Sequence, residues 1–321
     1  MPAISFEGRS YPVAAEQSAL DALLAGGVEA AHSCKAGTCG SCMMRAVEGA
    51  LPEKAQAGLK ASWKAQGYFL PCVCLPDADL SVAKVGSDAR WGAAITALER
   101  LSSDVLGVRL TCDTVINFRA GQYITLLLGG VLARSYSIAS LPGGLDIEIH
   151  VRRIAGGKMS GWLHDTAKVS DRVQIQGPSG DCFYLPGNPD QPLLLAGTGT
   201  GLAPLYGILL DALREGHKGP ISLFHGAVDE GGLYLRDELR DLAARYTNLE
   251  YTPCLLRETD GSMACGSIEQ VVLRRLPKLT GWRAFVCGDP VIVNLLRKKI
   301  FLAGAASRDI YGDAFVPSAL T

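Results

Sequence analysis

The sequence predicts a chain of α+β and α/β domains, because three different patterns follow one another along it. A cysteine-rich segment comes first, short alternating strands come second, and strands that alternate with helices come last. At about 100–200 residues per domain, 321 residues suffice for two or three domains. Hydrophobic residues make up 48% of the chain, enough for each domain to form a core. We place the domains at residues 1–88, 89–188 and 189–321.

The charge and hydropathy of the chain argue against a nucleic-acid partner and against a membrane span. Lys and Arg number 31 against 32 Asp and Glu, whereas nucleic-acid binding needs an excess of positive charge. The uncharged stretch from Gln191 to Leu210 is interrupted by Gly and Pro residues, so we expect no membrane span. The N-terminus lacks the pattern of a secretory signal, so we expect a cytoplasmic protein. Ten cysteines in a reducing compartment point to metal or redox chemistry.

The first segment begins with a short alternating hairpin and a helix. Leu20, Leu23 and Leu24 share one helical face, and Gly26-Gly27 can end that helix. The polar stretch from Asp77 to Arg90 reads as the linker to the second segment.

The cysteine run carries the strongest signal in the sequence. Cys34, Cys39 and Cys42 have the spacing C-x₄-C-x₂-C, which is that of plant-type [2Fe–2S] ferredoxins. Small residues between them let backbone N–H groups approach the sulfurs. Cys72 and Cys74 compete for the fourth ligand position. The alternative is structural zinc, which more often uses separated C-x₂-C or Cys/His pairs.

The second segment has the pattern of a small antiparallel barrel. Leu145 to Arg152 alternates between apolar and polar residues, as a half-buried strand does, and turn signals recur on both sides of it. The earlier motif Arg134-Ser135-Tyr136-Ser137 offers a ring that can stack on a flavin, a hydroxyl for the flavin edge and a guanidinium for phosphate. An ordinary strand with one exposed arginine is the alternative.

A glycine pair follows the alternating strand. Gly156-Gly157-Lys158-Met159-Ser160 begins a helix, and exposed N–H groups at a helix start bind phosphate. The alternative is a plain turn with Ser160 as the cap of the helix.

The third segment predicts a parallel sheet with covering helices. After an apolar strand, Gly197 to Pro204 forms the strand-to-helix turn at which a dinucleotide pyrophosphate binds, although Leu202 replaces the last glycine of the full fingerprint. Cys287 ends another strand, either as a core residue or beside the nucleotide crevice. We expect strands at Leu193–Ala196, Ile221–His225, Leu249–Cys254 and Ala284–Cys287, and helices at Leu235–Tyr246 and Val291–Leu302.

These signatures, in this order, resemble the ferredoxin–NAD(P)⁺ reductase superfamily over essentially the whole chain. The chain looks most like reductase components of bacterial multicomponent oxygenases, in particular of aromatic-ring-hydroxylating dioxygenases. The resemblance implies a β-grasp ferredoxin domain, an antiparallel β-barrel FAD domain and a parallel-sheet α/β NAD-binding domain. It implies an oxidoreductase that passes hydride from NADH to FAD, and single electrons through a [2Fe–2S] cluster to a terminal oxygenase component or a small ferredoxin.

The resemblance also implies roles for individual residues, position by position. It favours Cys72 over Cys74 as the fourth ligand, so the cluster residues are Cys34, Cys39, Cys42 and Cys72. The implied catalytic residues are Cys287, Tyr136 and Ser137. Those implied to bind FAD or the dinucleotide are Arg134, Tyr136, Ser137, His150, Val151, Arg152, Gly157, Ser160, Gly197, Thr198, Gly199, Thr200, Gly201, Gly288 and Phe315.

Val228, Gly232 and Ile292 depart from the family pattern and affect the expected ribose contacts. Asp229 and Glu230 would repel a 2′-phosphate, which favours NADH over NADPH. The same electron chain could also serve a di-iron monooxygenase, a desaturase or a deoxysugar dehydratase. Alternatives of another class are a non-enzymatic iron–sulfur sensor and a zinc-stabilised binding protein.

Overall fold

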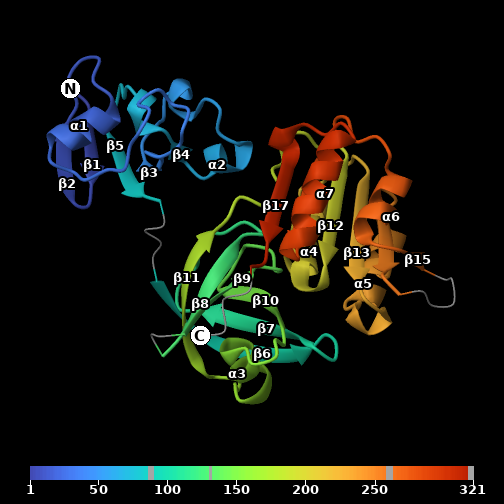
Figure 1. The fold of residues 1–321 in the computed structure, drawn as a ribbon. Helices are drawn as coiled ribbons and strands as arrows, with labels where there is room; N and C mark the ends of the chain where they lie inside the picture. Colours follow the sequence, from blue (N-terminus) through green and yellow to red (C-terminus); the bar gives the residue numbers. More distant parts are fainter. Residues whose placement is uncertain (86–89, 130–131, 258–262, 317–321) are drawn as a thin grey trace. The chain divides into compact units, whose positions relative to one another are not determined.

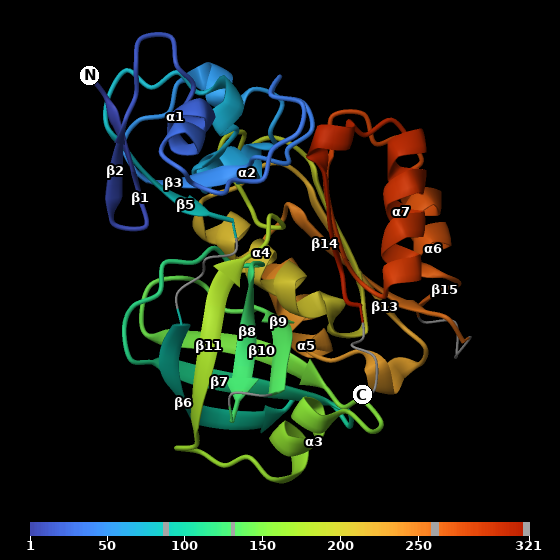
Figure 2. The same ribbon diagram turned by 60° about the vertical axis from the view of Figure 1, so that its left-hand side comes forward.

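The computed structural model describes the chain except for residues 86–89, 130–131, 258–262 and 317–321. The chain forms two compact units, Met1–Asp88 and Ala89–Thr321. The first unit holds one mixed sheet, and the second holds an antiparallel sheet and a parallel one (Figure 1 and Figure 2). This content confirms the predicted fold class. No helix in the described ranges is both long and apolar enough to cross a bilayer.

The first unit is a five-stranded sheet with two short helices. Its strand order is β2-β1-β5-β3-β4, so β5 lies at the centre, parallel to β1 and antiparallel to β3. Helix α1 begins after Ser18, whose hydroxyl oxygen accepts the N–H of Asp21 at 3.1 Å. The elements are β1 (Ala3–Phe6), β2 (Arg9–Pro12), α1 (Ala19–Ala25), β3 (Met44–Glu48), α2 (Ala61–Ala65), β4 (Tyr68–Phe69) and β5 (Leu80–Lys84).

The predicted linker from Asp77 to Arg90 is wrong in its middle. Strand β5 occupies its middle, and Leu80 and Val82 are buried in the core of the first unit. The strand is only five residues long and follows a polar stretch, so its alternating pattern was too weak to separate it from a linker. Residues 86–89 of the prediction lie outside the described residues.

The second unit begins with a six-stranded antiparallel sheet of order β10-β7-β6-β11-β8-β9. A bridge between Ile138 and Ile149 joins the two outermost strands of that order, which closes the predicted barrel. Ile147, Ile149 and Val151 face its core as the alternation predicted. The elements are β6 (Arg90–Arg100), β7 (Val105–Cys112), β8 (Tyr123–Leu128), β9 (Leu132–Ser137), β10 (Asp146–Arg152), α3 (Lys158–Asp165) and β11 (Arg172–Ser179).

A parallel sheet of order β15-β14-β13-β12-β16-β17 follows the barrel and confirms the four predicted strands and both predicted helices. The chain order reverses between β12 and β16, which creates the crevice where such sheets bind ligands. The elements are β12 (Leu193–Thr198), α4 (Leu202–Arg214), β13 (Ile221–Ala227), α5 (Arg236–Arg245), β14 (Leu249–Leu255), β15 (Ala264–Cys265), α6 (Ile268–Arg275), β16 (Arg283–Gly288), α7 (Pro290–Leu302) and β17 (Ile310–Ala314).

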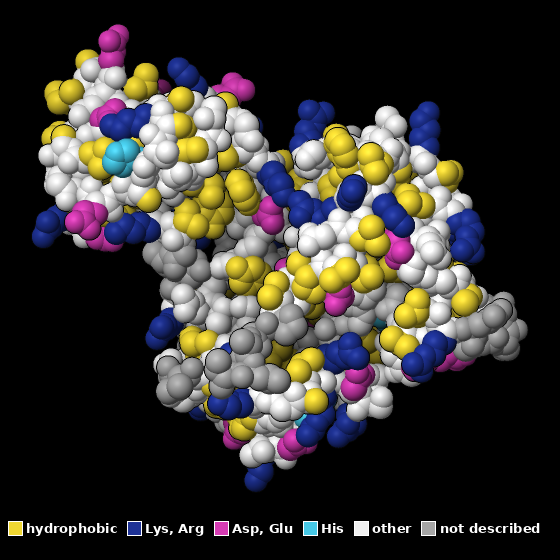
Figure 3. Space-filling model, in the orientation of Figure 1, with side chains coloured by type: hydrophobic (Ala, Val, Ile, Leu, Met, Phe, Trp, Pro, Cys, Tyr) yellow, Lys and Arg dark blue, Asp and Glu magenta, His cyan; other side chains and the backbone are white. Residues whose placement is uncertain are grey.

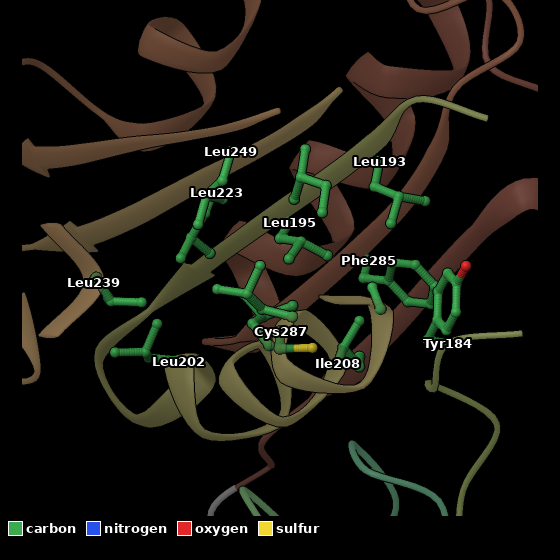
Figure 4. Packing of buried hydrophobic residues seen from close by; sticks show 14 of the residues in the cluster. Tyr184, Leu193, Leu195, Leu202, Ile208, Leu223, Leu239, Leu249, Phe285 and Cys287 are labelled. Atoms are coloured by element: carbon green, nitrogen blue, oxygen red, sulfur yellow. The ribbon is translucent and has the colours of Figure 1, made fainter. Parts of the chain in front are cut away.

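Apolar side chains fill both faces of the parallel sheet. On one face, Leu195 and Cys287 of the sheet pack against α4, which begins at Leu202 (Figure 4). On the other face, residues of α6 and α7 cover the sheet. In the view of Figure 3, Lys and Arg side chains are interspersed with acidic and apolar ones, in keeping with the balanced charge of the sequence.

Candidate functional site

The cysteine loop of the first unit turns its backbone amides toward sulfur. Lys35, Gly37 and Gly40 have φ of 51°, 74° and 72°, which bends the loop around its cysteines. The Sγ of Cys34 accepts the N–H of Ala36 at 3.4 Å and is 3.4 Å from the Thr38 hydroxyl. These hydrogen bonds lower the pKa of Cys34 to about 5, and the one from the Thr38 hydroxyl has the largest effect. The loop therefore favours a thiolate before any metal is considered.

The four predicted ligands lie in two pairs. Cys34 interacts with Cys39, and Cys42 interacts with Cys72. Among the described residues, no three His, Cys, Asp or Glu side chains are placed to hold one metal ion. Two thiol pairs suit a cluster of two irons, each of which takes two thiolates, better than a single tetrahedral zinc. The donor set thus fits a [2Fe–2S] cluster.

The two candidates for the fourth ligand lie in different surroundings. Cys74 is fully buried among the core residues of the first unit, and this burial raises the pKa of its thiol to about 12. Cys72 is only partly buried and packs beside Cys42. The contact with Cys42, another predicted ligand, favours Cys72 as the fourth ligand.

A cavity of about 770 Å³ lies in the second unit and takes its walls from both sheets. Strand β9 and the start of α3 form the barrel side, and the start of α4 and the end of β17 form the other. The predicted site residues on its wall are Arg134, Tyr136, Ser137, His150, Arg152, Gly157, Ser160, Thr200 and Phe315. Motifs far apart in the sequence therefore meet in one cavity large enough for a dinucleotide-sized ligand.

The charge of the cavity wall suits an anionic ligand. Arg134, Arg152 and Lys158 contribute cations to it, and Asp313 is its one acidic residue in the described structure. Burial raises the pKa of the Asp313 carboxyl, which weakens its negative charge. Burial also raises the pKa of Tyr136, whose ring therefore stays neutral. Cationic groups around a neutral aromatic ring fit a flavin that carries a pyrophosphate.

The start of α3 is open to a phosphate. The N-cap residue of α3 is Gly157, which has no side chain to cap the helix. A Cβ at Gly157 would stand 2.6 Å from the Ser160 hydroxyl, so the backbone here has no room for a larger residue. Ser160 does not cap the helix, because its oxygen accepts the N–H of Ile154 at 3.1 Å. The start of α3 therefore has no side-chain cap in the described structure, and a helix start of this kind binds anions.

The glycine-rich turn after β12 packs directly against the end of β16. A Cβ at Gly201 would stand 2.2 Å from the carbonyl oxygen of Cys287, and one at Gly288 would stand 2.7 Å from that of Thr198. At Gly199, with φ of 54°, only Arg152 lies within reach of an added Cβ. The turn is therefore tightly packed on the side that faces β16 and open at Gly199. A turn that binds pyrophosphate needs both properties.

The structure brings together only some of the predicted residues. Val151 is buried in the barrel core. Gly197, Thr198, Gly199, Gly201, Cys287 and Gly288 lie at the carboxyl ends of β12 and β16, outside the cavity wall. The Cys287 thiol is buried 3.7 Å from the sulfur of Cys182, and burial raises its pKa well above the ordinary value. His150, predicted on the polar side of its strand, is buried.

Sequence reasoning missed Asp313. Its carboxylate accepts a hydrogen bond from the Ser137 hydroxyl at 3.1 Å, so an acidic group stands beside the predicted catalytic serine. Asp313 lies two residues before Phe315, in a segment that the sequence had already singled out. An acidic residue in an otherwise apolar closing strand was the available signal.

Three family models match the chain. They describe a 2Fe-2S iron-sulfur cluster binding domain at residues 4–77, an oxidoreductase FAD-binding domain at 93–184 and an oxidoreductase NAD-binding domain at 195–298. The matches follow the same order as the sequence motifs.

Relatives match over nearly the full length. The ferredoxin–NAD(P)⁺ reductase component of the naphthalene 1,2-dioxygenase/salicylate 5-hydroxylase systems of a Ralstonia species is 32% identical, covering 93% of each chain. The reductase subunit of an Amycolatopsis aromatic O-demethylase is also 32% identical, covering 98% of this chain and 99% of the relative. The crystal structure of an Amycolatopsis cytochrome P450 reductase superposes with a TM-score of 0.70 at 30% identity, covering 99% of both chains.

Proposed function

The chain belongs to the family of oxidoreductases that join a 2Fe-2S domain, an FAD-binding domain and an NAD-binding domain as reductase components of oxygenase systems, and we propose how its own residues divide that work. The cavity shared by β9, α3, α4 and β17 carries the proposal, because one space is bounded by both the flavin motif and the nucleotide turn. We place the FAD and NAD domains at residues 89–188 and 189–321, on either side of the loop before β12.

The barrel side of the cavity binds FAD in this proposal. Tyr136 stacks on the flavin ring, while Arg134 and the start of α3 neutralise its pyrophosphate. When bound, FAD accepts two electrons with a hydride and releases them one at a time, and the [2Fe–2S] cluster carries single electrons. Phe315 stands on the opposite wall and shields the ring from water.

Ser137 and Asp313 form a hydrogen-bonded pair on the cavity wall. The serine hydroxyl donates to the Asp313 carboxylate, and burial raises the pKa of that carboxyl above its ordinary value. With FAD bound, such a pair would be able to exchange a proton with the site. Cys287, near the end of β16, stays a neutral thiol because burial raises its pKa, and it would lie near the nicotinamide when NADH is bound.

The cluster is held by Cys34, Cys39, Cys42 and Cys72. The cysteine loop is exposed at Cys34 and Cys39, which leaves that edge of the site accessible to an acceptor. We propose that the acceptor is the iron-containing terminal component of an oxygenase, and that a small ferredoxin is the intermediate carrier where one exists. Cytoplasmic location is part of the same proposal.

The donor in this proposal is NADH. Asp229 and Glu230 follow β13 at the carboxyl edge of the sheet and are exposed. Arg236 lies 3.3 Å from Glu230, so the nearby cation is already paired. A 2′-phosphate would meet negative charge there. Initial rates with NADH and NADPH at equal concentrations test this preference.

An anaerobic titration with NADH, followed by absorbance and electron paramagnetic resonance, tests the whole electron chain. The purified protein should take up two electrons per flavin and one per cluster, with the cluster signal growing as the flavin absorbance bleaches. A protein that contains flavin but shows no cluster signal after reconstitution with iron and sulfide would contradict the proposal.

A further inference from the structure

A buried tyrosine hydroxyl connects the two walls of the cavity. Tyr234 lies between β13 and α5 and is 1% exposed. Its hydroxyl is 3.2 Å from Nδ1 of His150, and the two rings meet edge to face with centroids 5.3 Å apart. His150 belongs to β10 of the barrel. This single contact therefore joins the nucleotide-binding sheet to the barrel through fully buried groups.

The partners of the tyrosine fix the direction of its hydrogen bonds. The backbone of Ala203 lies beside the Tyr234 oxygen and presents its N–H to it, which leaves the tyrosine proton to point at His150. Nδ1 of His150 then accepts, and the ring carries its proton on Nε2, 3.3 Å from the Glu148 carboxylate. Each of these groups therefore acts as a defined donor or acceptor in one series of contacts. A polar network whose members are all paired in this way can hold a fixed geometry.

The contacts of Tyr234 reach both walls of the cavity. His150 lines the cavity from the barrel, and Ala203 lines it from the first turn of α4. Helix α4 starts immediately after the glycine-rich turn that cradles the nucleotide. A shift at the Tyr234 hydroxyl would therefore move this turn relative to the flavin wall.

A second imidazole, that of His225, packs against the Tyr234 ring. His225 is completely buried, and its ring meets that of Tyr234 edge to face with centroids 5.6 Å apart. The backbone of Gly199 lies beside it, but within the described chain neither ring nitrogen completes a hydrogen bond. Burial lowers the pKa of His225 to about 4, so the ring is neutral and acts as a packing surface. Tyr234 is thus held between two imidazoles beneath the glycine-rich turn.

We propose that Tyr234 is a positioning residue, whose hydroxyl aligns the glycine-rich turn, and with it the nicotinamide, on the flavin wall through His150. The proposal rests on the function proposed above and adds to it the group that sets the hydride distance. Hydride transfer needs the reacting atoms at near-contact distance, and a misplacement of about 1 Å can slow such a step about 100-fold.

The chain contains a matched control for this contact. Tyr184 is also 1% exposed, and its hydroxyl lies 3.1 Å from Nδ1 of His217, with the rings edge to face at 5.6 Å. Both tyrosines belong to the same hydrophobic core. Tyr184 does not line the cavity. Removing its hydroxyl therefore reproduces the loss of a buried Tyr–His hydrogen bond without touching the nucleotide turn.

The test compares Tyr234→Phe with Tyr184→Phe. Both holoproteins should unfold at similarly lowered temperatures and retain their flavin. In anaerobic stopped flow, Tyr234→Phe should slow flavin reduction by NADH at least tenfold at saturating NADH, and weaken the long-wavelength absorbance of the flavin–nicotinamide complex. Tyr184→Phe should reduce its flavin at the wild-type rate. Equal slowing in both variants, or wild-type reduction by Tyr234→Phe, would overturn the proposal.

Substitutions at His150 provide a second, independent measurement. In His150→Asn the amide oxygen can replace Nδ1 as the acceptor from Tyr234, whereas in His150→Gln the amide reaches toward Glu148 instead. We expect the Asn variant to keep more of the flavin-reduction rate than the Gln variant, and the reverse order would refute the role of the tyrosine. Wild-type protein that shows no flavin reduction by NADH would instead refute the proposed function itself.

Discussion

The Ser137 hydroxyl donates a 3.1 Å hydrogen bond to the carboxylate of Asp313, across 176 residues of sequence. This contact joins β9 of the barrel to β17 of the parallel sheet on the wall of one cavity. It places a partly buried acid next to the serine of the flavin motif. The two sheets therefore supply one proton-holding pair between them.

The stability of the protein should depend on pH through Asp313. Burial raises its folded-state pKa above the ordinary 3.8, so the native state keeps a proton that the unfolded chain releases. Stability is therefore lost as pH rises from about 3.8 through the raised pKa. Asp313→Asn should raise the urea midpoint at neutral pH, and the gain should shrink as the solution is acidified.

Asp113 offers a control of opposite sign. The hydrogen bonds from Arg172 lower its pKa, and the pair is exposed. Asp113→Asn should leave the urea midpoint at neutral pH unchanged or slightly lower. A stabilised Asp113→Asn, or an Asp313→Asn variant whose midpoint follows that of the wild type at every pH, would contradict the assignment.

Cys39→Ser should separate the two halves of the electron path. Loss of one thiolate from the Cys34–Cys39 pair removes the cluster, because serine is a poor ligand for iron in such a site. Reduction of cytochrome c by NADH should fall at least tenfold, while reduction of ferricyanide by the flavin should persist. The exposed Cys265 has no assigned role, so Cys265→Ser should change neither activity. Loss of both activities in a folded Cys39→Ser protein would show that our division of labour is wrong.

Tyr136→Ala should weaken the retention of FAD. The substitution removes the aromatic wall of the cavity, and an aromatic pair contributes about 0.5–1.5 kcal/mol beyond its buried area. The flavin-to-protein ratio after gel filtration should therefore fall. Tyr136→Phe keeps the ring and should keep the flavin, and equal flavin content in all three proteins would argue against stacking.

Gly201→Ala should impair both folding and dinucleotide binding. Its Cβ would stand 2.2 Å from the Cys287 carbonyl oxygen, and both groups are backbone-anchored. Overpacking of this kind costs about 1–3 kcal/mol. We expect a lower unfolding temperature and a raised KM for NADH, with flavin content unchanged. Gly144 has nothing within 4 Å of an added Cβ, so Gly144→Ala is the matched control.

The sequence was sufficient to predict the fold class, four of the parallel strands and part of the cavity wall. The reason is physical, because the glycine-rich turn, the Arg134–Ser137 strand and the cysteine loop each need particular residues at fixed spacing. Such local constraints can be recognised in a single sequence, without an alignment of related sequences. The predicted pairing of Cys34, Cys39, Cys42 and Cys72 with a cluster stays a prediction.

Contacts made between distant segments could not be predicted. His150 has the pattern of a surface residue on its strand but is buried, with Tyr234 from the NAD-binding domain against its ring. Asp313 is a strand residue whose role depends on Ser137. Neither contact corresponds to a fixed spacing of residues in the sequence, because each depends on how the barrel and the parallel sheet pack.

The central place of β5 in the first sheet has a consequence for any attempt to transplant that unit into another protein. A fragment cut after Asp77 would keep every cysteine of the predicted cluster but would lack the strand that lies between β1 and β3. The two remaining strand pairs would then expose four unpaired edges to one another and to solvent. A chimaera must therefore carry the chain at least to Lys84, and one joined earlier should be insoluble.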